Sequence, residues 1–183
     1  SNIGFILQNG LHCCNCSVQD PNYTNIGHRT LISNRGNAPV RIQPGGVLND
    51  YVPFYFHCKM PMLFHIYKGY VADYNGKQED IIYLISSVET IDSMGLPYVF
   101  TDRHAYLEHK AMFNQKSDLQ QLNWGVIRED TWFKEYTELK KELKQAEFLV
   151  YQHVPVTALL GIVVHNDMIA TFVNTAITNA GLV

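Results

Sequence analysis

Glu147 is the residue whose type and position best suit catalysis. It stands directly before the apolar run 148–150, which predicts a strand with Glu147 at its start. A carboxylate at a strand end can be half-buried and rigidly held, and a catalytic group needs such support. The same pattern also fits an exposed glutamate at the end of an ordinary strand, and the pattern alone favours that simpler interpretation.

Arg35 is a second candidate, because it lies in a polar segment, residues 32–37, that predicts a loop. A planar guanidinium in a loop rich in Gly and Asn suits a phosphate or pyrophosphate, to which it donates two hydrogen bonds at once. A solvent-exposed loop arginine fits the same segment equally well.

Three polar residues, Asp102, Arg103 and His104, directly follow a predicted strand at 98–101. Functional sites often gather at such strand ends. The alternative is a turn in which Asp102 caps a helix that continues through residue 107. Both interpretations remain open from the sequence.

A glycine-containing loop turns into an aromatic strand between residues 45 and 56. The pair Gly45-Gly46 lets the backbone approach a ligand or adopt positive φ. Aromatic side chains with polar tips follow it and can line a pocket for a planar, hydroxyl-rich ligand. A loop that leads into an ordinary core strand is the simpler alternative.

Lysines and cysteines form two further groups. A predicted helix over 133–144, with Phe133, Tyr136 and Leu143 near one face, carries lysines that suit either DNA phosphates or a solvated face: Lys134, Lys140, Lys141 and Lys144. The cysteines, Cys13, Cys14, Cys16 and Cys58, lack the paired spacing of a zinc site. We therefore expect no metal and reduced thiols in a cytosolic protein.

The remaining pattern predicts a single α+β domain over residues 1–183. Helices are expected at 3–10, ended by Gly10, near Leu31 and at 167–175, with long ordered loops over 12–44. Strands are expected at 51–57, 62–67, 81–85, 98–101, 146–151 and 159–164. The net charge of −3 gives no global attraction to nucleic acid. No apolar run is long enough for a membrane span.

Six segments together resemble the DarT family of DNA ADP-ribosyltransferase toxins. They are residues 2–11, 25–28 with Arg35, 48–56, 60–63, 100–105 and 145–150. The strand segment Leu48-Asn49-Asp50-Tyr51-Val52-Pro53-Phe54-Tyr55-Phe56 and the segment Gln145-Ala146-Glu147 are the most specific. The segments occur in the family's order over nearly the whole chain.

The resemblance implies an ADP-ribosyltransferase fold, with a split β-sheet core, short surrounding helices and a long substrate and NAD loop. It implies a cytoplasmic enzyme that transfers ADP-ribose from NAD, without a metal, to a base of single-stranded DNA, typically thymine, in a short sequence context. It also implies a macrodomain antitoxin of the DarG type that removes the mark, and no membrane partner. The rival expectations are an ADP-ribosyltransferase that acts on protein or RNA, and a catalytically impaired nucleotide- or nucleic-acid-binding module.

The resemblance also implies the site residues. Glu147 and Arg35 match catalytic positions. The NAD-binding positions are Gly10, Leu11, Asn25, Gly27, Arg35, Asp50 and Tyr51, and the DNA-binding positions are Asn49, Met62, His104 and Lys141. Relatives carry a histidine-containing segment just before the position of Asn2, and they often have histidine where this chain has Asn49.

Overall fold

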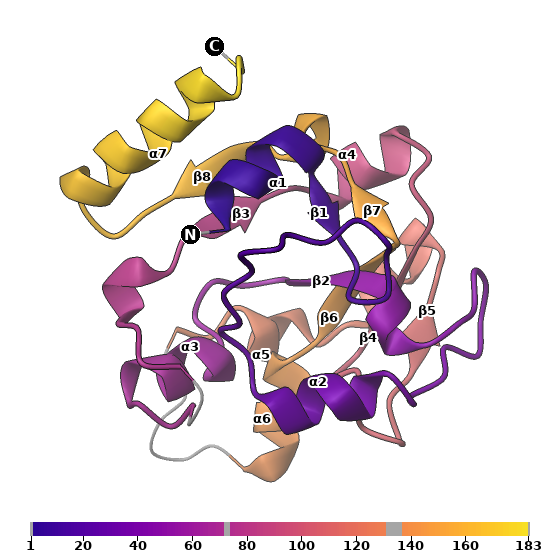
Figure 1. Ribbon diagram of the computed structural model, residues 1–183. Helices are drawn as coiled ribbons and strands as arrows, with labels where there is room; N and C mark the ends of the chain where they lie inside the picture. The colour runs from indigo at the N-terminus through magenta and orange to yellow at the C-terminus, as the bar shows by residue number, and fades with distance from the viewer. Residues whose placement is uncertain (1, 72–73, 131–136, 183) are drawn as a thin grey trace.

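The computed structural model describes residues 2–71, 74–130 and 137–182. Its largest sheet is antiparallel and has four strands in the order β2-β6-β4-β5 (Figure 1). These are β2 (Tyr51–Tyr55), β6 (Glu147–Tyr151), β4 (Tyr98–Thr101) and β5 (Met112–Phe113). The two central strands, β6 and β4, are buried almost throughout, because their continuous apolar runs pack on both faces.

Two smaller antiparallel pairs complete the β structure of the described residues. β1 (Leu11–His12) pairs with β7 (His153–Val154), and β3 (Tyr83–Ile85) pairs with β8 (Gly161–Val163). The described residues therefore form three separate sheets with helices around them, which confirms the expected α+β fold with a split β-sheet core.

Short helices surround the sheets. They are α1 (Ile3–Asn9), α2 (Arg29–Arg35), α3 (Pro61–Tyr67), α4 (Val88–Ser93), α5 (Trp124–Ile127), α6 (Glu138–Lys144) and α7 (Asp167–Asn179), with 3-10 turns η1 (Leu48–Asp50), η2 (Gln78–Asp80), η3 (Lys116–Gln121) and η4 (Val156–Ala158). Side chains of Ser87, Thr137 and Asn166 cap three of the helices by accepting backbone N–H bonds. α7 lies beside α1 at one end of the molecule (Figure 1). No helix of the described residues is long and apolar enough to cross a membrane.

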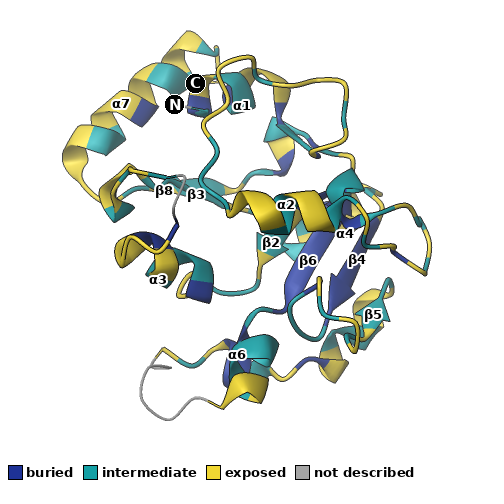
Figure 2. Cartoon of the chain, turned by 60° about the horizontal axis from the view of Figure 1, so that its bottom comes forward, coloured by how far each residue is buried: buried dark blue, intermediate teal, exposed yellow. Residues whose placement is uncertain are grey.

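The central sheet separates two apolar clusters. Alternation along β6 sends Phe148 and Val150 to one face, where they join Phe100, and sends Leu149 to the other, where it joins Val99. Figure 2 shows the two central strands, β6 and β4, as buried. The second cluster also includes residues of two loops, Val40 and Ala105. The sheet thereby fixes the loops that border Glu147.

Several predicted elements are confirmed. α1 ends at Gly10, which has a φ of 78°, and a single helix, α2, occurs within the long loops, around Leu31. The strands predicted from residues 51 and 98 are present, and Glu147 begins its strand as expected. The predicted positions Phe133, Lys134 and Tyr136 lie outside the described residues.

One strand prediction was wrong, and a second was right only in part. The segment 62–67 lies within helix α3, because Pro61 occupies the first turn, where proline presets a helical φ. A short apolar run does not distinguish a strand from a helix. The strand expected to be buried at 81–85 covers only residues 83–85, and Ile85 is 43% exposed.

The alternative helix after Asp102 is also absent from the described residues. The Asp102 carboxylate instead accepts the Ala111 N–H at 2.8 Å and the Arg103 guanidinium at 2.8 and 3.0 Å. These bonds close residues 102–111 into a loop between β4 and β5. The Asp102 carboxylate thus accepts a backbone N–H within a loop and does not cap the N-terminus of a helix.

Lys144 is fully buried, so the expectation of a solvated lysine face was wrong for this residue. Its Nζ donates to the carbonyls of Ile127 at 2.6 Å and Glu129 at 2.5 Å and lies 3.5 Å from Nδ1 of His57. Burial lowers the pKa of the Lys144 ammonium. The Lys144 side chain thereby joins the end of α6 to the end of α5 and the residues that follow it. Lys144 itself lies three residues before Glu147 in the sequence.

We expect Lys144→Ala to destabilise the fold by about 2–4 kcal/mol, because it leaves two buried carbonyls without their charged donor. Lys141→Ala is the matched control, since Lys141 lies on the same helix and makes only a surface ion pair with Glu138; its cost should stay below about 1 kcal/mol. Urea unfolding measures both. Equal free energies of unfolding for the two variants would contradict this role for Lys144.

Candidate active site

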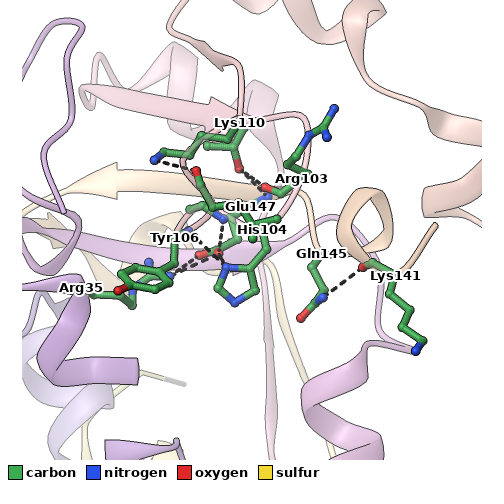
Figure 3. Close-up of polar contacts among 11 residues, drawn as sticks. Arg35, Arg103, His104, Tyr106, Lys110, Lys141, Gln145 and Glu147 are labelled. Carbon is green, nitrogen blue, oxygen red and sulfur yellow. Dashed lines mark hydrogen bonds and ion pairs between the residues drawn. The ribbon is translucent and has the colours of Figure 1, made fainter. Parts of the chain in front are cut away.

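The centre of the site is the carboxylate of Glu147, which is only 2% exposed. Nη1 of Arg35 donates to both of its oxygens, at 2.9 and 3.2 Å, and the backbone N–H of Ala105 donates to Oε1 at 2.9 Å (Figure 3). The acceptors face only N–H donors, an arrangement that suits an ionised carboxylate. Glu147 is more deeply buried than the half-buried group that the sequence suggested.

Arg35 is the last residue of helix α2, not a loop residue as predicted. The side-chain amide of Asn49 donates to the carbonyl of Ile32 at 3.0 Å and thereby holds this helix against η1. The guanidinium is 11% exposed, and its Nη2 is buried without a hydrogen-bond partner among the described residues. Arg35 thus has one donor engaged with Glu147 and one buried donor left over.

Thr101 connects the strand end to the polar residues that follow. Its Oγ1 accepts the backbone N–H of Glu147 at 3.2 Å and donates to the carbonyl of Arg103 at 2.6 Å. Arg103 pairs with Asp102 and lies 3.5 Å from a carboxylate oxygen of Glu142. The polar cluster predicted at this strand end is therefore real, and it orients His104 toward Glu147.

His104 lies beside the ion pair, with Nδ1 at 3.8 Å from Oε1 of Glu147. Nδ1 accepts the backbone N–H of Tyr106 at 3.1 Å, so in the neutral ring the proton is on Nε2. Burial lowers the pKa of His104; Arg35 and Lys110 act in the same direction, and Glu147 opposes them. The imidazole is therefore a neutral donor at pH 7.

Two residues near Glu147, Tyr106 and Lys110, were not singled out from the sequence, and Tyr55 was expected only as one of the aromatic residues that could line a pocket. Tyr55 is the cross-strand partner of Glu147, and burial together with the Glu147 charge raises the pKa of its hydroxyl above the usual range. Tyr106 and Lys110 lie on the same loop as His104 (Figure 3). Strand pairing was the signal for Tyr55, but its register was not known from the sequence.

The expected NAD positions are distributed over several segments. Gly10 and Leu11 join α1 to β1, and a side chain at Gly10 would collide with the carbonyl of Val154 and the ring of His153. The side chain of Asn25 closes a small turn with both backbone groups of Gly27.

Asp50 and Tyr51 mainly hold their own loop. The Asp50 carboxylate accepts bonds from the Val47 N–H and the Asn15 amide, each at 2.7 Å. The hydroxyl of Tyr51, a residue 2% exposed, donates to the carbonyl of Gly45 at 2.6 Å. Asp50 and Tyr51 thus hold the segment that follows the paired glycines. In the described residues, neither side chain forms a hydrogen bond with Glu147.

The expected DNA positions also differ in placement. His104 lies directly beside the Arg35–Glu147 pair. Asn49 reaches the pair only indirectly, through its bond to helix α2, which carries Arg35. Met62 is half-buried on α3. Lys141 pairs with Glu138 at 2.5 Å and points away from Glu147 (Figure 3).

Nothing in the described part of the chain gathers three or more potential metal ligands. The cysteines of the chain are free, and burial raises the pKa of the Cys13 thiol to about 12. The ionisable side chains that the structure gathers at Glu147 are a carboxylate, a guanidinium and an imidazole.

The split antiparallel sheets, with a buried glutamate at the start of a central strand, fit the α+β fold of an ADP-ribosyltransferase. The family model described as "ssDNA thymidine ADP-ribosyltransferase, DarT" matches residues 1–183. A "DNA ADP-ribosyl transferase" of Escherichia coli O127:H6 is 38% identical over 167 residues, which are 91% of this chain and 77% of that protein. The chain belongs to the DarT family.

Two solved structures extend this similarity. Thermus sp. 2.9 DarT in complex with ADP-ribosylated ssDNA is 37% identical, with a TM-score of 0.92 over 98% of this chain and 84% of that chain. The same Thermus protein in complex with NAD+ is 37% identical, with a TM-score of 0.86 over 98% of this chain and 85% of that chain. The chain therefore belongs to a family of single-stranded DNA thymidine ADP-ribosyltransferases, as the sequence resemblance implied.

Proposed function

We propose that Glu147 and Arg35 carry the transfer of ADP-ribose to thymidine, in a sequence-dependent way, within one domain formed by residues 1–183. The observation that supports these roles is the buried pair itself, whose atoms lie 2.9 Å apart at the start of a central strand. We further propose that the enzyme acts in the cytoplasm, where both NAD and DNA are available.

The residues present fit NAD in two respects. Nη2 of Arg35 is a buried donor without a partner in the described residues, and a ligand oxygen would satisfy it. Gly10 lines a surface hollow with Asn9 and His153, at a backbone position that no side chain can occupy. Under this proposal the NAD-binding positions are Gly10, Leu11, Asn25, Gly27, Arg35, Asp50 and Tyr51.

NAD supplies the ADP-ribosyl group, and cleavage of its nicotinamide–ribose bond leaves positive charge on the ribose. Glu147 would stabilise this charge, because its carboxylate is buried and rigidly held by three N–H bonds. Arg35 stays protonated and would orient substrate oxygens rather than remove a proton.

On the DNA side, His104 would donate from Nε2 to a carbonyl oxygen of thymine. Such a bond would stabilise the negative charge that develops on the base as its ring nitrogen bonds to the ribose carbon, nicotinamide leaves with the electrons of its bond, and the proton of that nitrogen passes to solvent. Neutral imidazoles act as donors in this way elsewhere. The base must leave the stack to reach a buried carboxylate, which favours single strands. Asn49, Met62 and Lys141 are the further DNA-binding positions of this proposal.

Glu147→Gln should lower the rate of transfer about 1,000-fold or more, because it removes the charge that stabilises the ribose cation while keeping the side-chain shape. The measurement is the mass of a thymidine-containing single-stranded oligonucleotide after incubation with NAD. An oligonucleotide without thymidine is the substrate control.

Glu79→Gln is the matched control variant, since Glu79 is exposed on η2, and it should modify the oligonucleotide at the normal rate. Circular dichroism checks that Glu147→Gln folds. Transfer by folded Glu147→Gln at the normal rate would exclude the proposed role.

Activity should fall as the pH drops below the ordinary histidine pKa of about 6.5. Because the pKa of His104 is lowered, the ring stays neutral at pH 7 and gains a proton only at more acidic pH. That proton would occupy Nδ1, the acceptor of the Tyr106 N–H, and add a cation beside Arg35. We expect the acid limb of kcat/KM in the native enzyme and not in His104→Gln.

His57→Gln is the control for this pH profile, because the pKa of His57 is also lowered, while His57 contacts Lys144 rather than Glu147. It should retain the acid limb. An acid limb that persists in His104→Gln and disappears in His57→Gln would contradict the role of His104.

We also propose a macrodomain antitoxin of the DarG type as the partner of this enzyme, a proposal that rests on the family resemblance. Such a macrodomain should remove the added mass from the modified oligonucleotide. Persistence of the full added mass after this treatment would count against the pairing.

A further inference from the structure

Two loops that pack into the apolar cluster around Leu149 each carry a cation. Residues 102–111 form the loop between β4 and β5, which includes His104 and Lys110. Residues 38–47 form a second loop, closed by a bridge between Pro39 and Val47 and by a 2.8 Å bond from the Val40 N–H to the Gly46 carbonyl. Arg41 lies in this second loop.

The two loops are fixed against one another. Val40 of one loop and Ala105 of the other belong to the same apolar cluster, which Ile42 and Met112 extend. The side-chain amide of Asn114 donates to the carbonyl of Gln43 at 3.1 Å and joins the two hairpins. Arg41, between two residues of this cluster, is exposed. Its charge therefore faces solvent near the loop of Lys110.

Around Lys110 the positive charges of Arg41 and Arg35 are joined by the negative charges of Glu108 and Glu147. Burial, the charge of Arg41 and, more weakly, that of Arg35 lower the pKa of Lys110, while Glu108 and Glu147 act in the opposite direction. Nζ of Lys110 donates only to the carbonyl of Leu107, at 3.1 Å, in the described residues.

Neither Arg41 nor Lys110 forms an ion pair with a carboxylate of the described residues, and Lys68, Lys77 and Arg128 form none either, whereas Arg35 and five other basic residues do. Besides that of Arg35 with Glu147, those pairs are Lys59 with Asp130, Arg103 with Asp102, Lys116 with Glu89 and Asp92, Lys140 with Glu129, and Lys141 with Glu138. Like charges that gather without an acidic partner repel one another until an anion binds between them. The two cations, neither of them paired directly with a carboxylate of the described residues, can together attract an anion.

We propose that Arg41 and Lys110 form a phosphate-binding subsite beside the Arg35–Glu147 pair. The proposal rests on the proposed function, because it takes Glu147 as the reacting centre. Phosphate groups occur in both substrates, as the phosphodiesters of the DNA strand and as the pyrophosphate of NAD. The DNA strand is the favoured source, since Lys110 shares its loop with His104, which the proposal places against the thymine base (Figure 3).

The test compares Arg41→Gln, Lys110→Gln and the double variant with Lys77→Gln, an exposed lysine on the loop before η2. One arm measures the Kd for a fluorescent thymidine-containing single strand by anisotropy over a range of salt concentrations. The other measures the KM for NAD at saturating DNA. Thermal melting shows that each variant is folded.

We expect each single variant to raise the Kd for DNA about tenfold, as loss of one charge-assisted bond does. The slope of log K against log salt should become shallower by about 0.7 for each lost contact. The KM for NAD should not change, and Lys77→Gln should bind like the native protein. Lys110→Arg should bind DNA with a Kd within about twofold of the native value, because it keeps the charge.

A raised KM for NAD with unchanged DNA binding would keep the phosphate subsite and assign it to the pyrophosphate. Unchanged affinity for both substrates in the folded double variant would overturn the subsite. Transfer by Glu147→Gln reports separately on the proposed function, because Arg41 and Lys110 affect affinity and Glu147 affects the rate at saturation.

Discussion

The structure depends on one buried ion pair between residues that are 112 positions apart, Arg35 and Glu147. Burying two charges costs several kcal/mol of desolvation free energy, and their attraction offsets little more than this cost. The pair therefore adds little net stability, although either partner alone would be strongly destabilising. Its effect is positional, because it holds a carboxylate and a guanidinium together at the head of a central strand.

The other contacts of Glu147 bring a third segment to the same place. Thr101 receives its backbone N–H and Ala105 donates to its side chain, so β4 and the following loop are fixed by the same residue. Helix α2, strand β6 and the loop after β4 thus converge on a single carboxylate. The apolar face formed by Val99 and Leu149 lies directly behind them and keeps the arrangement rigid.

The sequence predicted features that local pattern determines: Glu147 at the start of a strand, the polar cluster after Thr101 and the end of α1 at Gly10. It did not predict the burial of Lys144, because a helical pattern does not reveal which neighbours will cover a face. It assigned α3 to a strand, since short apolar runs suit both structures. The contact between Arg35 and Glu147 depends on tertiary packing; only the family resemblance linked these residues.

The closure of residues 102–111 by Asp102 has an evolutionary consequence. The Asp102 carboxylate accepts the Ala111 N–H and so joins the first and last residues of this loop. The residues between them are therefore held by contacts within the loop and with Glu147 more than by the sheet. Exposed positions such as Tyr106 and Glu108 are free to diverge without loss of the scaffold. Under the proposed function, substitutions at these exposed positions would change the DNA sequence preference of this enzyme while Arg35 and Glu147 stay in place.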